Sequence, residues 1–214
     1  MIGVLNYQTG NAQSVLFALH HLGLEARLVA TPEEADSAGG VDRYILPGVG
    51  AADVTMASLR ERGWVEHLDR RVRGEGVPFL GVCVGLQALF EHSSEGDVDC
   101  LGWLPGTVVR FRREGLRVPH MGWNAVRPCS EHPFARALPE LANFYFVNSF
   151  HAVPAEEADV AGLTEYGVEF ASMVARGNVM ATQFHIEKSG PVGLGLLASF
   201  AQLQPHELEQ VPVC

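Results

Sequence analysis

A buried strand runs directly into a possible nucleophile in residues 77–87, VPFLGVCVGLQ. The apolar run before Cys83 predicts a strand, and the residues after it predict the start of a helix. Gly81 and Gly85 stand two residues before and two residues after Cys83, where small residues allow the sharp turn that exposes a nucleophile between strand and helix. The segment therefore predicts a parallel α/β sheet with the Cys83 thiol at the carboxyl end of one strand.

Strands and helices alternate through the first half of the chain. Short apolar runs predict the strands, which are 2–5, 25–29, 44–46 and 77–82. Helices are expected to begin near Asn11, Pro32 and Ala51. Gly63 is expected to divide the third helix into two pieces. Because alternating elements of this kind pair through βαβ crossovers, this half of the chain predicts a doubly wound parallel sheet.

Beyond about residue 97 the pattern changes to short strands separated by Gly and Pro turns. The expected strands are 107–111, 116–119, 144–150, 168–174 and 179–184. Some should continue the central sheet and others should form an antiparallel flap or second layer, before a closing helix at 192–203. No repeat or linker divides the 214 residues. The sequence therefore predicts a single α/β domain over residues 1–214, with three layers, a mostly parallel central sheet flanked by helices, and a smaller antiparallel section.

Composition narrows the class of protein. Acidic residues outnumber basic ones by 25 to 15, for a formal net charge of −10, whereas nucleic acids and anionic membranes bind clustered cations. No stretch approaches the roughly 18 apolar residues of a membrane span, and no basic region precedes the apolar N-terminus as in an export signal. The four cysteines lack paired spacing. We therefore expect reduced thiols and a cytoplasmic protein with no disulfide framework, metal site, nucleic-acid partner or membrane partner.

A thiol nucleophile requires a base, and nine histidines compete for this role. His185 is the best candidate because it follows the apolar strand 179–184 and Glu187 comes two residues later. Residues i and i+2 of an extended chain face the same side, so Glu187 can hold the imidazole in one tautomer. Cys83, His185 and Glu187 are therefore the predicted nucleophile, base and orienting acid.

The other histidines are weaker candidates. His120 and His151 lie beside apolar segments and rank next. The rest lie on helical patterns or in loops without an obvious acid to orient them, and are expected to be structural or exposed: His20, His21, His67, His92, His132 and His206. Cys83 itself could also be an inert cysteine in a tight turn, as buried free cysteines commonly are.

Two backbone segments are suited to stabilise an oxyanion. The N–H of Val84 opens the helix after the nucleophile and points to where the charge would develop. Residues 47–50, PGVG, follow a strand expected to end beside Cys83, and their small residues let a second N–H, of Val49 or Gly50, approach a ligand. This turn lacks the GKS or GKT residues that end a Walker phosphate-binding loop, so a phosphate site is not expected.

Residues 81–87 and 183–189, GVCVGLQ and QFHIEKS, resemble the class I, or triad-type, glutamine amidotransferases. Further matches narrow the resemblance to the glutaminase subunits of imidazole glycerol phosphate synthase. They are 6–7 (NY), 10–11 (GN), 14–15 (SV), 46–50 (LPGVG), 118–124 (VPHMGWN) and 145–147 (YFV). The segment 118–124 is the most specific of them.

The resemblance implies a half-reaction. Cys83 would attack the side-chain amide of glutamine, His185 would protonate the departing ammonia, and water would hydrolyse the γ-glutamyl thioester to glutamate. Gly50, Gln87 and Ser149 would hold the glutamine, and no cofactor would take part.

The resemblance also implies a partner. A cyclase subunit with a (β/α)8-barrel fold would form a heterodimer with this chain, receive the ammonia through an internal tunnel, and make imidazole glycerol phosphate and an aminoimidazole-carboxamide ribotide. Rotation of the Gly48–Val49 peptide would complete the oxyanion hole once the partner holds its substrate. The candidates for the partner contact or the tunnel are Asn11, Met121, Trp123, Asn124, Tyr145 and Lys188, the sole lysine. Trp123 and Tyr145 could instead be half-buried core aromatics.

Two positions depart from the family pattern. Ile186 replaces the usual proline between the catalytic His and Glu, and Asn148 stands where a histidine is common. Three other functions stay open: a glutaminase that serves another synthase, such as pyridoxal phosphate synthase; a γ-glutamyl peptidase; and a docking module without activity.

Overall fold

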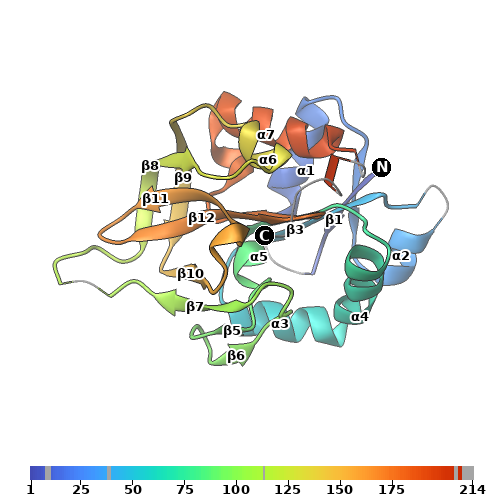
Figure 1. Cartoon of the computed structure of the whole chain (residues 1–214). Coiled ribbons are helices and arrows are strands. Elements are labelled where there is room, and N and C mark those ends of the chain that lie inside the picture. Colours follow the sequence, from blue (N-terminus) through green and yellow to red (C-terminus); the bar gives the residue numbers. More distant parts are fainter. Residues whose placement is uncertain (8–10, 38–39, 113, 205–206, 209–214) are drawn as a thin grey trace.

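The computed structural model describes residues 1–7, 11–37, 40–112, 114–204 and 207–208, so Gly10, His206 and Cys214 lie outside the described residues. A sheet of thirteen strands organises this part of the chain (Figure 1). None of its helices is long and apolar enough to cross a membrane.

Parallel strands form one side of the sheet, in the order β2-β1-β3-β4-β13. Their bounds are β1 Ile2–Leu5, β2 Ala26–Val29, β3 Arg43–Gly48, β4 Phe79–Cys83 and β13 Val179–Thr182. Gly48 lies opposite Cys83 and Thr182 lies opposite Val82. The carboxyl ends of β3, β4 and β13 therefore meet at one edge, as expected for a doubly wound sheet.

Mostly antiparallel strands extend the sheet beyond β13. They are β5 His92–Ser93, β6 Val98–Asp99, β7 Gly106–Arg110, β8 His120–Pro128, β9 Ala142–Asn148, β10 Phe150–Pro154, β11 Val160–Glu165 and β12 Glu169–Arg176. The path continues β12-β10-β7-β5-β6, while β11, β8 and β9 branch from β12. The antiparallel section is confirmed, and it is larger than expected.

Helices cover both faces of the parallel strands, giving the predicted three layers (Figure 1). They are α1 Ala12–His21, α2 Pro32–Asp36, α3 Ala52–Glu61, α4 Trp64–Leu68, the π-helix η1 Asp69–Gly74, α5 Val84–Gln87, α6 Pro133–Arg136 and α7 Gly190–Gln202, with the 3-10 turns η2 Glu157–Asp159 and η3 Ile186–Lys188. Gly63 separates α3 from α4 with a left-handed φ of 70°, as predicted.

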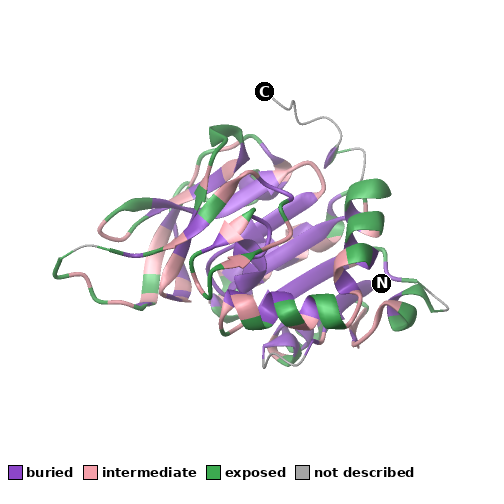
Figure 2. Cartoon of the chain, turned by 90° about the horizontal axis from the view of Figure 1, so that it is seen from below, coloured by how far each residue is buried: buried purple, intermediate pink, exposed green. Residues whose placement is uncertain are grey.

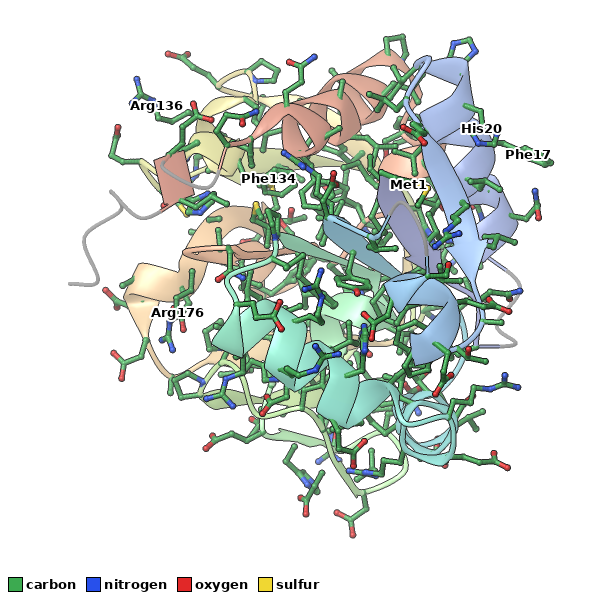
Figure 3. The ribbon with its side chains drawn as sticks, turned by 90° about the vertical axis from the view of Figure 1, so that its right-hand side faces the viewer. Met1, Phe17, His20, Phe134, Arg136 and Arg176 are labelled. Carbon is green, nitrogen blue, oxygen red and sulfur yellow. The ribbon has the colours of Figure 1, made fainter. Side chains whose placement is uncertain are left out.

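Each face of the sheet has its own hydrophobic core. On one side α1 and α7 contribute Val15, Leu19 and Phe200, and on the other α3 and α4 contribute Met56 and Trp64. Figure 2 shows the buried strands between helices whose outer residues are exposed. The outward side of α1 carries Phe17, which is 63% exposed (Figure 3).

Three expected strands differ in the structure. Residues 116–119 form no strand: Leu116 and Val118 pack against the core, and β8 begins only after Pro119. Pro119 cannot donate a ladder hydrogen bond, which disfavours a strand there.

The expected strand 144–150 is two strands divided at Ser149. Asn148 Nδ2 donates to Phe150 O at 2.9 Å across this break. The last expected strand, 179–184, ends at Thr182, whose hydroxyl donates to Phe184 O at 3.0 Å.

Candidate active site

Cys83 lies in the turn between β4 and α5 with φ 57° and ψ −106°. A positive φ is uncommon for a residue with a side chain and costs about 1–3 kcal/mol, so it is retained where the surrounding structure imposes it. Here the close approach of α5 to β3 and β4 imposes it, and Gly81 and Gly85 permit that approach: a Cβ on Gly81 would come within 2.6 Å of the Gly85 carbonyl carbon, and one on Gly85 would collide with Leu46 O. The glycines therefore let α5 fold back against β3 and β4, with Cys83 at the bend.

His185 and Glu187 form a buried pair beside this turn. His185 Nδ1 lies 3.0 Å from Glu187 Oε1, and the two side chains are 3% and 0% exposed. The strand geometry used to predict the pair was wrong, because Glu187 lies in the 3-10 turn η3. Two hydrogen bonds of the His185 backbone fix the turn instead: His185 N donates to Tyr145 O at 2.9 Å, and Ser189 Oγ donates to His185 O at 2.6 Å.

The pair favours a protonated imidazole. Burial lowers the pKa of His185, but its hydrogen bonds to Cys83 and Glu187 and the charges of both groups outweigh this and raise that pKa to about 10. Burial raises the pKa of Glu187, but the hydrogen bond and charge of His185 and the bond from Asn11 lower it below its ordinary value. Because Nδ1 donates to Glu187, Nε2 is the nitrogen left to face Cys83.

A pocket of about 240 Å³ opens at Cys83 and His185. Every residue predicted for the oxyanion hole or for glutamine lines it: Val49, Gly50, Val84, Gln87 and Ser149. The pocket is smaller than the usual site for a drug-sized ligand and suits a small molecule such as an amino acid.

A chain of amides connects the pocket wall to the sulfur. Gln87 Nε2 donates to Gln183 Oε1 at 3.1 Å and to Phe150 O at 3.2 Å. Gln183 Nε2 in turn lies 3.7 Å from Cys83 Sγ. Among the described residues Gln87 Oε1 has no hydrogen-bond partner although it is buried, so it is a ready acceptor for a ligand.

Glu95 is a pocket residue that the sequence did not reveal. Its Oε2 accepts from Ala52 N, at the start of α3, at 3.1 Å, and burial raises its pKa. It stands in the turn between β5 and β6, among other acidic residues. No spacing in the sequence separates it from an ordinary exposed carboxylate.

Asn11 and Asn124, two candidates for the partner contact or the tunnel, form hydrogen bonds within the chain. Asn11 is 2% exposed, and its Nδ2 lies 2.9 Å from Glu187 Oε1. Asn124 Nδ2 donates to Glu165 O at 2.9 Å, and its Oδ1 accepts from Ala125 N. Both amides are therefore engaged within the chain.

The other expected contact residues lie at the surface. Met121 and Trp123 of β8 are 64% and 59% exposed, and Lys188 is exposed immediately after Glu187. Trp123 lies opposite Tyr145 of β9, with ring centroids 6.0 Å apart. Trp123 is thus not a core aromatic, and Tyr145 is half-buried beneath it.

None of the other described histidines lines the pocket. Burial lowers the pKa of His120 to about 4, and this ring stacks on Tyr166 at 3.8 Å between centroids. The His151 ring lies 4.5 Å from the Phe111 ring between centroids, tilted by 32°, and burial lowers the pKa of His151 as well. For His92 the expectation that no acid accompanies it was wrong.

The acids beside His92 are Asp97 and Asp99, each 3.1 Å from one ring nitrogen on the β5–β6 hairpin. The hydrogen bond that His92 donates to Asp99 is the main reason that the pKa of His92 is raised.

The two departures from the family pattern are accommodated by packing. Ile186 is fully buried in the core beneath α7. Asn148 is 5% exposed and bonds to Phe150 O at the pocket wall.

The family model and the similar curated proteins assign this chain to the same family. The glutamine amidotransferase class-I family model matches residues 4–201. The chain is 44% identical over 207 residues to "Imidazole glycerol phosphate synthase subunit HisH" of Dehalococcoides mccartyi, covering 95% of this chain and 97% of that one. It is 46% identical over 206 residues to the protein of the same name from Moorella thermoacetica, covering 96% of each.

Solved structures share the fold. A crystal structure of a glutamine amidotransferase has a TM-score of 0.71 at 22% identity and covers 94% of this chain and 98% of that one. PurLQS from Thermotoga maritima has a TM-score of 0.70 at 17% identity, covering 94% and 96%. The chain therefore belongs to the class I glutamine amidotransferases and, within that class, to the HisH family.

Proposed function

We propose that the chain is the glutaminase subunit of an imidazole glycerol phosphate synthase and hydrolyses glutamine to glutamate and ammonia. The observation that carries the proposal is the site itself: Cys83 on a strained turn, beside an imidazole that Glu187 holds by Nδ1. The full-length similarity to HisH proteins favours this synthase over other ammonia-using partners.

The reaction proceeds through a thioester. Cys83 Sγ attacks the amide carbon of glutamine, and the carbonyl oxygen acquires the negative charge, which the N–H groups of Val84 and of Val49 or Gly50 stabilise. His185 Nε2 gives its proton to the leaving nitrogen, and ammonia departs. His185 then takes a proton from water, which attacks the thioester and releases glutamate and Cys83.

The pocket also has groups that can bind the α-amino and α-carboxylate groups of glutamine. Glu95 supplies a carboxylate and Gln87 supplies an unpaired Oε1, both suited to the α-ammonium group. Ser149 also lines the pocket, between β9 and β10 in the sequence. The peptide before Val49 would rotate about the ψ of Gly48 and the φ of Val49, and Gly48 has no side chain to restrict its ψ.

The partner surface is the outer face of the β8–β9 pair. Met121 lies opposite Val147, a pocket residue, and Trp123 lies opposite Tyr145. This exposed apolar face therefore continues to the pocket wall, so a (β/α)8-barrel cyclase docked here receives ammonia close to where it forms and carries out the lyase step. In neutral water ammonia becomes protonated to ammonium, which has no lone pair for attack, so direct transfer to the cyclase keeps the nitrogen as reactive ammonia. A single domain and a cytoplasmic location remain part of the proposal.

The test is the glutaminase rate of the chain alone, with the cyclase, and with the cyclase and its nucleotide ligand. We expect the rate to rise when both are added. No stimulation would favour a different synthase, and fast hydrolysis of γ-glutamyl peptides by the isolated chain would favour a peptidase. Failure of a glutamine-like alkylating agent to label Cys83 would favour a docking module.

The pH dependence of stability gives an independent check on the pair. The His185 pKa of about 10 exceeds the value of about 6.5 in an unfolded chain. Protonation of His185 therefore stabilises the fold; this contribution is complete below about pH 6.5 and is lost as the pH rises through about 10. The lowered pKa of Glu187 acts in the opposite range: its contribution is present above the ordinary value of 4.5 and is lost as the pH falls.

We expect NMR titration of labelled histidine to show His185 protonated throughout the neutral range. In Cys83→Ala its pKa should fall, because Cys83 supplies both a hydrogen bond and a charge that raise it. A wild-type His185 that titrates near pH 6.5 would contradict the proposed electrostatics.

A further inference from the structure

Asn11 occupies the N-cap position of α1 without capping it through its side chain. Asparagine is favoured at this position because its side-chain oxygen usually accepts a bond from one of the first N–H groups of the helix. Here the backbone carbonyl of Asn11 accepts from Ser14 N at 3.1 Å and Val15 N at 3.3 Å. Because the side-chain amide makes no capping bond, it can form hydrogen bonds with another part of the molecule.

That part is the buried His–Glu pair, far away in the sequence. Asn11 Nδ2 lies 2.9 Å from Glu187 Oε1 and 3.3 Å from His185 Nδ1. Because Nδ1 already carries the proton donated to Glu187, the Asn11 amide can donate only to the carboxylate. Two side-chain N–H groups thus converge on Oε1, whereas Oε2 has no hydrogen-bond partner among the described residues.

We propose that Asn11 is a positioning residue: it fixes the rotation of Glu187, which holds the His185 ring in the orientation whose Nε2 faces Cys83. The inference rests on the proposed glutaminase function. Without Asn11 the carboxylate keeps one side-chain donor, and the buried group can turn about its last bonds. The imidazole then loses the fixed acceptor that sets its orientation.

The position of Asn11 outside the pocket distinguishes a positioning role from a role in substrate binding. Asn11 does not line the pocket, so its loss should leave the affinity for glutamine unchanged. It should lower kcat, because small misplacement of a reacting group can reduce the rate by about 100-fold.

The first variant removes the amide. In the complex with the cyclase, Asn11→Leu is expected to lower kcat by about 10–100-fold with KM within about 2-fold of wild type. The matched control is Asn178→Leu, because Asn178 Nδ2 bonds to Val72 O at 2.8 Å and Val77 O at 2.9 Å, away from the site. The control should lower Tm and leave kcat unchanged.

The second variant replaces the donor by an acid. In Asn11→Asp two carboxylates adjoin, and like charges raise the pKa of one of them. When the introduced carboxyl group is protonated its hydroxyl replaces the amide donor, and when it is ionised it repels Glu187. The activity ratio of Asn11→Asp to wild type should therefore rise as the pH is lowered.

The groups facing this site are His185 and Glu187, with Cys83 beyond the imidazole. The packed helix α7 carries no titratable side chain. Lys188 is exposed on the same turn as Glu187. The expected change in the ratio therefore belongs to the engineered carboxylate pair.

A spectroscopic measurement keeps the inference separate from the proposed function. The Nδ1 proton of His185 should give a low-field NMR resonance in the wild type that is lost or shifted in Asn11→Leu, whatever the enzyme catalyses. An inactive wild-type complex would overturn the proposed function alone. An unchanged resonance, an unchanged kcat, a rise in KM in place of the kcat loss, or an equal kcat loss in Asn178→Leu would overturn the role of Asn11.

Discussion

Cys83→Ala is expected to lower glutamine-dependent synthesis by the complex by a factor on the order of 10⁴–10⁶, while synthesis from added ammonium salt stays at the wild-type level. Among the described residues that line the pocket Cys83 is the one thiol, and the carboxylate of Glu95 accepts a hydrogen bond from Ala52 N. Ammonia supplied from solution bypasses the thioester. The measurement is the cyclase product formed from each nitrogen source.

The matched control is Cys100→Ala. Cys100 is a free, half-buried thiol outside the pocket, and burial raises its pKa to about 11. Its replacement should leave both activities intact, and a glutamine-like alkylating agent should add to Cys83 and not to Cys100. Equal loss of both activities in Cys83→Ala would instead assign Cys83 a structural role.

The parallel strands and the turn at Cys83 could be predicted because they depend on patterns that are local in the sequence. An apolar run, a nucleophile and two flanking glycines are sufficient to indicate a strand, a sharp turn and a helix. The same local pattern failed at residues 116–119, where apolar side chains pack without joining the sheet ahead of Pro119. Hydrophobicity reports burial, and hydrogen bonding of the backbone decides what is a strand.

The pairing of His185 with Glu187 illustrates a correct contact predicted from the wrong geometry. Two-residue spacing was read as two side chains on one strand face, but the chain turns after Thr182 and Glu187 lies in a 3-10 turn. The Ser189 hydroxyl holds this turn, because it accepts from Tyr145 N and donates to His185 O. Spacing alone therefore identified the partners and not the conformation.

Asn11 and Gln183 could not be assigned from the sequence because their partners are distant along it. Asn11 is separated from Glu187 by 176 positions, and Gln183 from Cys83 by 100. Amide side chains have no diagnostic spacing, so only the folded chain brings them to the site. Family resemblance named Asn11 as a candidate for the partner contact or the tunnel and gave no sign of its hydrogen bond to Glu187.

Gly85→Ala is expected to lower the free energy of unfolding by about 3 kcal/mol or more, although alanine is intrinsically the better helix former. A Cβ at Gly85 would collide with the backbone oxygen of Leu46 on β3 and would lie 3.4 Å from the Leu46 Cγ. Backbone cannot yield as a flexible side chain does, so α5 must move away from the sheet. The measurement is chemical denaturation of the isolated chain.

Gly195→Ala is the matched control, because it is the same substitution in a helix where a new Cβ meets nothing within 4 Å. Alanine lowers the conformational entropy of the unfolded chain, so this variant should be more stable by about 0.4–1 kcal/mol. If both variants gained stability, close packing of α5 on β3 would not be what selects glycine at position 85. If Gly85→Ala alone is destabilised, Cys83 in that variant should also react less with the alkylating agent. The reason is that the packing of Gly85 against β3 also holds the Cys83 sulfur beside His185.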